Sequence, residues 1–320
     1  MNNKKKVIPI FFSVDDNYVP YLAVALKSLI SNSSKKYDYK AIVLYQDVNE
    51  TNVKRIENLK TDGFDIEFVP MRNRLESITD RMSNRLRADY FTLTIYFRLF
   101  IPALFPEYDK GIYLDSDVVV LGDISELYGI SLNDNLIGAS VDYSIQNIPE
   151  FAKYTEKGVG VSVSKYINSG VLLMNLKKLR EVAIDTRFLE LLNTYHFDTI
   201  APDQDYINAL CYGKIEYIPE TWDTMPAEGT ATSKKPKLIH YNLFAKPWCY
   251  DDIQYEDYFW KYAKETEFFS EIKKYKEKYS SEQKKSDIEC TGRMLKRALE
   301  IAEQNENFRT VFEMGKERRL

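Results

Sequence analysis

The opening of the chain alternates short apolar runs with segments of helical periodicity, and this order restricts the fold more than any other feature. The run Val7–Val14 is rich in β-branched and aromatic residues and has the length of a buried strand, whereas 19–30 carries leucines at helical spacing. Further strands are predicted at 41–45 and 65–70, with a helix over 49–60 between them. Strands joined by helices predict a parallel sheet covered by helices, which binds ligands at the carboxyl ends of its strands.

The rest of the chain continues this alternation. The polar, irregular segment 72–89 is typical of a mobile flap or a solvated helix, and 91–104 is predicted as a buried helix with one charge, Arg98. Further strands are expected at 112–114, 118–121, 136–141, 214–219 and 237–242, with a loop after 141. Within 167–180 a strand is expected to run into a helix, and another helix begins at Pro202. The expected architecture is α/β, with one domain over 1–250 and a charged helical extension over 251–320. In that extension the residues at helical spacing are Met294, Leu295, Ala298, Ile301 and Ala302.

Composition excludes several classes of protein. The chain of 320 residues has 44 Lys and Arg against 48 Asp and Glu, a net charge of −4, so it lacks the basic excess of a nucleic-acid binder. Its three cysteines are far apart and without CxxC spacing, which argues against disulfides and indicates a reducing cytoplasm. The basic start lacks a cleavage pattern, so 7–14 is interpreted as a strand, and no apolar run is long enough to span a bilayer.

Two carboxylates, Asp115 and Asp117, stand one residue apart in "YLDSDVVV". Residues i and i+2 of a strand point the same way, so these side chains are expected to converge. Carboxylates this close repel each other, and Mg²⁺ or Mn²⁺ between them would remove the repulsion and leave positions open for phosphate oxygens. The alternative is a surface turn, since roughly one Asp-x-Asp is expected by chance in a chain of this length. The apolar flanks favour a site at the ends of buried strands.

A second triplet, Asp203-Gln204-Asp205, follows Pro202. Here capping of a helix start is an equally good interpretation, because Asp at such a start interacts with free N–H groups and with the helix dipole.

The chain has two histidines. His196 follows a helical segment and is interpreted as a helix-end or surface residue. His240 ends a predicted strand, where a structural role is the commoner one. Lys246 follows it in "HYNLFAKPW" as a cation suited to a phosphate.

Several motifs occur in a fixed order along residues 7–250, and together they resemble glycosyltransferase family 8. They are "SVDDNY", "YFRL", "YLDSDVVV", "INSGVLLMNLKKLR", "DQDYIN" and "HYNLFAKPW". The family includes bacterial lipopolysaccharide α-galactosyl- and α-glucosyltransferases and, more distantly, glycogenin. The resemblance implies a GT-A fold with a Rossmann-like, mainly parallel mixed sheet. It also implies transfer of a hexose from UDP-galactose or UDP-glucose with retention, using Mn²⁺ or, as the alternative, Mg²⁺.

The resemblance also implies a role for each matching side chain. The implied metal ligands are Asp115, Asp117 and His240. The implied donor-binding residues are Ser13, Asp15, Asn17, Tyr18, Arg98, Asp115, Ser116, Asp203 and Lys246, with Tyr18 stacked on the uracil. The implied catalytic residues around the transferred sugar are Asp142, Asn168, Gln204 and Asp205. Because the Gln204 amide is a poor nucleophile, same-face attack is favoured over a covalent intermediate.

Purely structural interpretations stand beside these roles. Arg98 could form a buried ion pair, Asn168 could be a turn residue, and Gly170 could be needed for its backbone conformation. No glycine-rich loop follows the first strand, so dinucleotide binding is disfavoured and base, ribose and metal contacts must hold the nucleotide. The pair Asn242-Leu243 stands where family members often carry a glycine near the phosphates.

Two rival functions remain at this point. "IYLDSDVVV" also resembles the first motif of haloacid-dehalogenase-type phosphatases, but that motif normally opens the domain, and three predicted strands precede it here. A non-catalytic protein that binds nucleotide sugars is the second rival. The acceptor is expected to be a glycan, glycolipid or glycoprotein. The tail from 251 mixes both charge signs, which favours core packing or self-association over docking at the inner face of the membrane, where contact would be peripheral at most.

Overall fold

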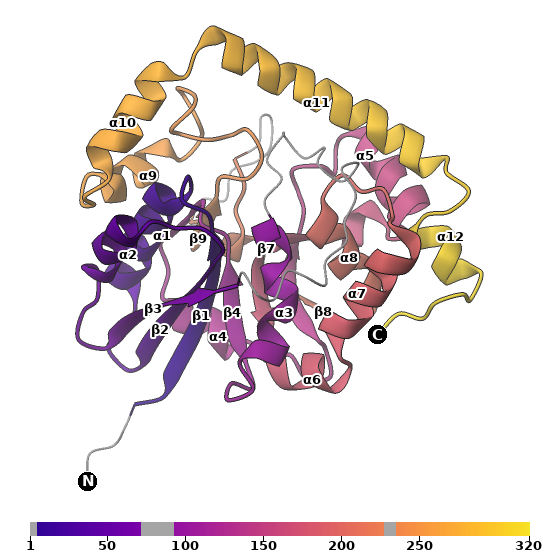
Figure 1. The fold of residues 1–320 in the computed structure, drawn as a ribbon, viewed down its shortest axis with the longest axis horizontal. Helices are drawn as coiled ribbons and strands as arrows, with labels where there is room; N and C mark the ends of the chain where they lie inside the picture. Colours follow the sequence, from indigo (N-terminus) through magenta and orange to yellow (C-terminus); the bar gives the residue numbers. More distant parts are fainter. Residues whose placement is uncertain (1–4, 72–92, 227–234) are drawn as a thin grey trace.

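The protein is a mixed α/β structure built around one large sheet. Figure 1 shows the computed structural model, which describes residues 5–71, 93–226 and 235–320. The predicted flap at 72–89 lies outside the described residues. The strands of the large sheet are β1 (Val7–Val14), β2 (Asp38–Tyr45), β3 (Phe64–Pro70), β4 (Gly111–Leu114), β6 (Ile137–Val141), β7 (Ile167–Met174) and β8 (Ile215–Tyr217). A separate pair consists of β5 (Val118–Val120) and β9 (Leu238–His240).

The large sheet has the order β3-β2-β1-β4-β7-β6-β8. Strands β3, β2, β1 and β4 run parallel, as the opening of the sequence predicts, while β7 is antiparallel to both β4 and β6. Because β1 and β4 are parallel neighbours, their carboxyl ends meet at one edge of the sheet. The residues that follow these two strands, from Asp15 and from Asp115 onward, therefore come together in space.

Alternation along each strand divides the core into two clusters, one on each face of the sheet. In β1, Ile10 and Phe12 belong to one cluster and Phe11 to the other. The same alternation separates Ile112 from Tyr113 in β4. Side chains of successive strand residues point to opposite faces, so strands buried on both sides must be apolar throughout.

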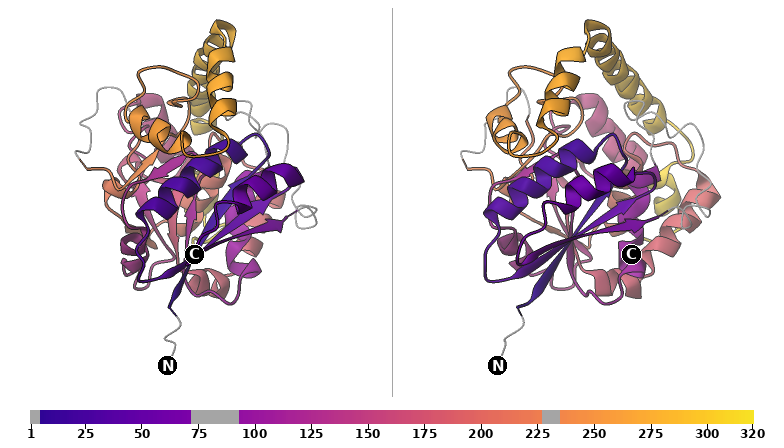
Figure 2. Two further views of the ribbon diagram at one scale, coloured as in Figure 1. Left: turned by 90° about the vertical axis from the view of Figure 1, so that its left-hand side faces the viewer. Right: turned by 60° about the vertical axis from the view of Figure 1, so that its left-hand side comes forward.

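Helices cover both faces of the sheet (Figure 2). They are α1 (Val19–Asn32), α2 (Glu50–Glu57), α3 (Phe97–Leu104), α4 (Ile124–Gly129), α5 (Pro149–Tyr154), α6 (Leu176–Glu181), α7 (Ile184–Tyr195) and α8 (Pro202–Cys211). The helix expected over 91–104 is α3 preceded by a 3₁₀ turn, Leu93–Tyr96. The loop expected after 141 instead contains α5 and a π-helical turn, because Phe151 and Tyr154 are buried there. His196 directly follows α7 with φ 48°, which agrees with the helix-end interpretation.

The C-terminal helical extension consists of α9 (Glu256–Ala263), α10 (Phe269–Lys278), α11 (Ser281–Ala302) and α12 (Phe308–Glu313). In Figure 1, α11 crosses the upper edge of the molecule from α10 to α5. Met294, Ala298 and Ile301 are buried, as their helical spacing predicts. The aromatic ring of Phe268 is also buried, so core packing of the extension is confirmed.

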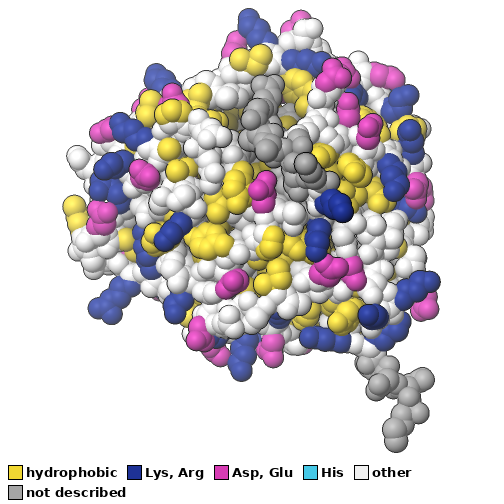
Figure 3. Space-filling view, turned by 180° about the vertical axis from the view of Figure 1, so that it is seen from behind, with side chains coloured by type: hydrophobic (Ala, Val, Ile, Leu, Met, Phe, Trp, Pro, Cys, Tyr) yellow, Lys and Arg dark blue, Asp and Glu magenta, His cyan; other side chains and the backbone are white. Residues whose placement is uncertain are grey.

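Lys, Arg, Asp and Glu side chains are interspersed over the surface seen in Figure 3, which fits the near balance of the two signs in the sequence. Among the described residues, the helices are too short or too polar for any of them to cross a membrane.

Candidate active site

The Asp-Ser-Asp segment forms the turn between β4 and β5. The backbone N–H of Asp115 donates a 2.8 Å hydrogen bond to the carbonyl of Gly170, which continues the pairing of β4 with β7. The chain then leaves the large sheet, and β5 pairs antiparallel with β9, which places Val118 opposite His240. This register brings the only histidine that ends a described strand to the aspartate pair.

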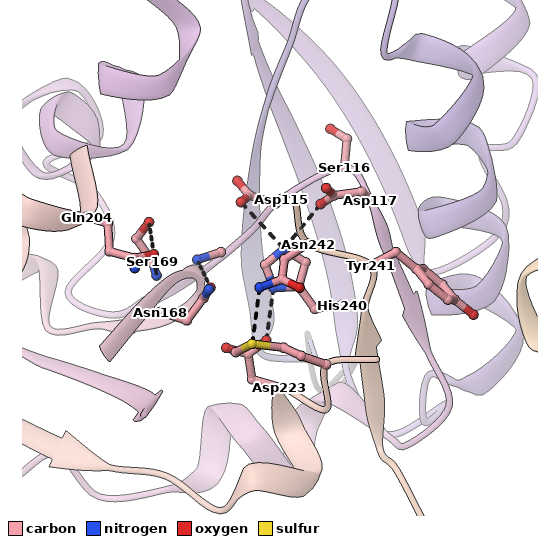
Figure 4. Close-up of polar contacts among 12 residues, drawn as sticks. Asp115, Ser116, Asp117, Asn168, Ser169, Gln204, Asp223, His240, Tyr241 and Asn242 are labelled. Carbon is pink, nitrogen blue, oxygen red and sulfur yellow. Dashed lines mark hydrogen bonds and ion pairs between the residues drawn. The ribbon is translucent and has the colours of Figure 1, made fainter. Parts of the chain in front are cut away.

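The three predicted metal ligands lie together. His240 Nε2 is 3.3 Å from Asp117 Oδ1 and 3.8 Å from Asp115 Oδ2, and one ligand atom from each residue lies within 4.8 Å of the others. Figure 4 shows the carboxylates and the imidazole pointing toward one another. Two carboxylate oxygens and an imidazole nitrogen are donors that a divalent ion such as Mn²⁺ or Mg²⁺ accepts. The residues therefore fit such an ion.

Positive groups balance the carboxylates. Arg98 forms buried ion pairs, in agreement with one of the two interpretations of the sequence. Its Nη2 is 2.8 Å from Asp115 Oδ1, and its Nε is 3.2 Å from Asp203 Oδ2. Lys246 donates to Asp117 and to the carbonyl of Tyr241. Burial alone would raise the pKa of Asp117, but Lys246 and His240 outweigh it and hold that pKa well below its usual range. These contacts favour the ionised form of Asp117.

His240 carries positive charge in this arrangement. Burial would lower its pKa, but the Asp117 and Asp223 carboxylates outweigh burial and raise it to about 10. An imidazole must be neutral to bind a metal, so a divalent ion entering this cluster would displace the proton from Nε2. The ion would take over the charge balance that the imidazolium supplies.

Asp223 belongs to the candidate site by its contact with His240, and sequence reasoning missed it. Its carboxylate is fully buried, and Oδ1 lies 3.0 Å from His240 Nδ1. A hydrogen bond from Nδ1–H to Asp223 fixes the ring so that Nε2 faces Asp115 and Asp117, the arrangement typical of metal-binding histidines. Burial raises the pKa of Asp223 to about 6. The acid stands in "ETWDTM", and no spacing rule in that segment links it to the distant histidine.

Gly170 is required for close packing at the site. It lies in the strand β7, so the turn interpretation of Asn168 and the backbone interpretation of Gly170 are wrong. A Cβ at this position would lie 2.2 Å from His240 Cε1 and 2.7 Å from Asp115 Oδ2, closer than real Cβ contacts come. Only a residue without a side chain leaves the imidazole in its place.

Three of the four residues expected around the transferred sugar, Asp142, Asn168 and Gln204, form one hydrogen-bonded group. Asp142 Oδ2 accepts hydrogen bonds from the Asn168 amide at 3.2 Å and from the Gln204 amide at 3.0 Å. Gln204 Oε1 in turn accepts the backbone N–H of Ser169 at 3.0 Å. Their side chains are buried and do not line the cavity described below, whereas the donor-binding candidates Arg98 and Asp203 do. Hydrogen bonds to both Oε1 and Nε2 therefore fix the orientation of the Gln204 amide.

Asp205 occupies a different environment from its neighbours. It is fully buried, and its two oxygens accept 2.6 Å hydrogen bonds from the hydroxyls of Tyr154 and Tyr166. Burial raises the pKa of Asp205 to about 6. Its Oδ2 also accepts the N–H of Ala201, the N-cap residue of α8, at 3.0 Å, which agrees with the helix-start interpretation of the second triplet. Its catalytic role stays a prediction.

The expected nucleoside-binding residues follow β1. Asp15 Oδ1 accepts the backbone N–H groups of Asn17 at 3.0 Å and Tyr18 at 3.1 Å, a local turn that leads into α1. Ser116 donates a 3.3 Å hydrogen bond to the carbonyl of Ser13, which ties the aspartate turn to the end of β1.

One cavity of about 580 Å³ joins these parts of the site. All of the predicted metal ligands and donor-binding residues line it: Ser13, Asp15, Asn17, Tyr18, Arg98, Asp115, Ser116, Asp117, Asp203, His240 and Lys246. Leu243, which also lines it, has φ 49°, a left-handed conformation that favours glycine. This geometry explains physically why a glycine would suit the position.

This mixed, mainly parallel sheet flanked by helices is the GT-A type fold of glycosyltransferases. The family model "Glycosyl transferase family 8" matches residues 9–252. The chain belongs to glycosyltransferase family 8.

Individual relatives agree with this assignment. A putative glycosyltransferase of Haemophilus influenzae is 30% identical over 230 residues, which cover 72% of this chain and 67% of that protein. Lipopolysaccharide 1,2-glucosyltransferase of Escherichia coli K12 is 25% identical over 77% of this chain and 74% of its own length.

Solved structures agree as well. The galactosyltransferase LgtC, in complex with donor and acceptor sugar analogues, is 28% identical with a TM-score of 0.70 and covers 81% of this chain and 96% of its own. The bifunctional glycosyltransferase WbbM is 25% identical with a TM-score of 0.74 and covers 84% of this chain, which spans about half, 52%, of the WbbM chain.

Proposed function

We propose that this enzyme transfers galactose or glucose from the corresponding UDP-sugar to a carbohydrate-bearing acceptor, with retention of anomeric configuration and with Mn²⁺, or Mg²⁺, as cofactor. The observation that carries the proposal is the cluster of Asp115, Asp117 and His240 in the same cavity as Asn17 and Tyr18. The names of the glucosyltransferase and galactosyltransferase relatives support a hexose as the transferred group.

In the proposed mechanism Asp115, Asp117 and His240 would hold a divalent ion, whose positive charge would stabilise the leaving diphosphate. Asp223 would keep the His240 ring in the orientation that ligation needs. Lys246, which already bonds Asp117, lies close enough to the ligands to share the charge that develops on the leaving diphosphate.

At the sugar end, the Arg98–Asp203 pair offers a donor and an acceptor to sugar hydroxyls. Gln204 is bonded by protein groups at both ends of its amide, which suits an electrostatic and positioning role better than nucleophilic attack. We therefore favour same-face attack by the acceptor, with the leaving phosphate as the base.

We further propose a cytoplasmic enzyme that builds a glycan, glycolipid or glycoprotein, including acceptors presented at the inner face of the membrane. Its three cysteines, Cys211, Cys249 and Cys290, are buried and form no disulfide, which supports a reducing compartment. We place residues 1–250 in the catalytic domain and 251–320 in the extension.

The test is release of UDP from a panel of UDP-hexoses, with and without Mn²⁺ and without acceptor, in parallel with calorimetry of UDP binding. We expect Mn²⁺-dependent release from UDP-galactose or UDP-glucose, lost in Asp117→Ala. The matched control is Asp134→Ala, which removes a carboxylate that is 94% exposed. UDP binding without turnover of any UDP-hexose would indicate a non-catalytic binder, and phosphomonoester hydrolysis without UDP binding would indicate a phosphatase.

A further inference from the structure

The C-terminal extension is attached to both halves of the molecule. On one side, α10 packs against α1 through buried Ile272, and Glu271 forms a 2.8 Å ion pair with Arg55 of α2. On the other side, the second half of α11 packs on α5, and Arg297 forms a 2.5 Å ion pair with Asp198. The extension therefore bridges the upper edge of the sheet, as Figures 1 and 2 show from different directions.

Two tyrosines stabilise the junction between α10 and α11 through hydrogen bonds to Asp287. Asp287 Oδ2 accepts hydrogen bonds from the Tyr250 hydroxyl at 2.5 Å and from the Tyr279 hydroxyl at 2.6 Å. The rings of Tyr250 and Tyr279 meet edge to face at 5.8 Å, and the Tyr275 ring is 5.9 Å from that of Tyr279. The rings of Tyr250, Tyr275 and Tyr279 therefore form one aromatic cluster.

The same tyrosines line the cavity that contains the metal-ligand cluster and the residues after β1. Tyr18, which directly precedes α1, lines the same cavity, and α10 packs against α1. Tyr21 connects the two regions, since its ring meets that of Tyr18 edge to face at 5.5 Å and stacks on Trp248 at 4.0 Å. The extension thus contributes an aromatic wall to the cavity that Tyr18 also lines.

We propose that this wall, Tyr275 and Tyr279, forms part of the subsite for the nucleobase of the donor, opposite Tyr18. The inference rests on the proposed function, because it takes the donor to be a nucleoside diphosphate sugar. Flat aromatic rings provide stacking surface for a base, and each stacked base gains affinity from such a ring. The Asp287 carboxylate fixes the orientation of Tyr279.

The test measures binding of UDP and of inorganic pyrophosphate, both with Mn²⁺, by calorimetry. The variants are Tyr275→Ala and Tyr279→Ala. The control is Tyr258→Ala, an equally exposed ring of α9 that is absent from the cavity wall. We expect Tyr275→Ala to weaken UDP binding roughly 5- to 150-fold and to leave pyrophosphate binding unchanged. Tyr275 is 39% exposed, so its variant should unfold at the wild-type temperature and give an interpretable result even if Tyr279→Ala is unstable.

Wild-type affinity of folded Tyr275→Ala for UDP would overturn the inference and leave the proposed function standing. Equal weakening for UDP and pyrophosphate would also overturn it, because the wall would then act on the phosphates or on the metal. An unchanged UDP affinity with a raised KM for acceptor would assign the wall to the acceptor instead. Failure of the wild-type protein to bind UDP would overturn the proposed function and the inference together.

Discussion

Substitution Gly170→Ala tests whether the packing around His240 sets the geometry of the metal-ligand cluster. The added methyl would lie 2.2 Å from His240 Cε1 and 2.8 Å from Nε2, whereas ordinary contacts begin near 3.4 Å. The imidazole or the strand must therefore move by about 1 Å. His240 is 3% exposed and is hydrogen-bonded to Asp223, so the ring has no open space into which it can turn.

A displacement of this size is large for a ligand, because misplacement by about 1 Å costs on the order of 100-fold where geometry matters. We expect Mn²⁺ affinity, measured by the electron paramagnetic resonance signal of free Mn²⁺, to fall on the order of 100-fold. The overpacked core should cost about 1–3 kcal/mol of unfolding free energy, measured by denaturant unfolding without metal.

The matched control is Gly292→Ala. A Cβ there meets nothing within 4 Å, and the residue lies inside the helix α11. This control should keep wild-type Mn²⁺ affinity and gain about 0.5–1 kcal/mol of stability, because glycine is a poor helix former. Folded Gly170→Ala protein with wild-type Mn²⁺ affinity would refute the packing argument and, with it, the placement of His240 as a ligand held by β7.

Two further predictions follow from buried carboxylates. Asp223→Ala should lower Mn²⁺ affinity about 10- to 100-fold, because His240 loses the group that orients it. Asp223→Asn should lose less affinity, because its amide oxygen can still accept the hydrogen bond from His240 Nδ1–H. The same paramagnetic resonance titration measures both variants, and equal losses would contradict an orienting role. The pKa of Asp205 is raised to about 6 from 3.8, so between these values the folded protein holds a proton that the unfolded chain has released, and this contribution to stability falls as pH rises through the window. The stability cost of Asp205→Asn relative to wild type should therefore be smaller at neutral pH than near pH 4.5, by about 2 kcal/mol in urea unfolding, whereas an equal cost at both would contradict the raised pKa.

The local features of the sequence predicted much of the fold. Strand β1 has the predicted bounds, and β2 and β3 begin and end within a few residues of prediction, because each is an apolar run between turn signals. The helix α5 was missed, since its six residues are too few for a periodic pattern to stand out. Its helical state depends on packing of Phe151 and Tyr154 beneath α11, and such distant contacts are not visible in a local window.

The site residues that belong to sequence motifs could be predicted, whereas those that reach the site only through tertiary packing could not. Adjacent carboxylates and a histidine at a strand end could be recognised, and the structure brings them together. Asp223 could not be recognised, because it reaches His240 only after the chain passes from β8 to β9. The steric need for Gly170 was hidden for the same reason, since the atoms that exclude a side chain belong to β9 and to the aspartate turn.

The pairing of β5 with β9 has a consequence for biosynthesis. Val120 and Leu238 are neighbours in space, yet more than a hundred residues of chain separate them, so this contact carries a large loop-closure cost and forms late. On the ribosome the two aspartates emerge well before the histidine that completes their cluster. Nascent chains therefore carry only the pair of carboxylates, and the proposed site for a divalent ion is complete only when the native topology is reached.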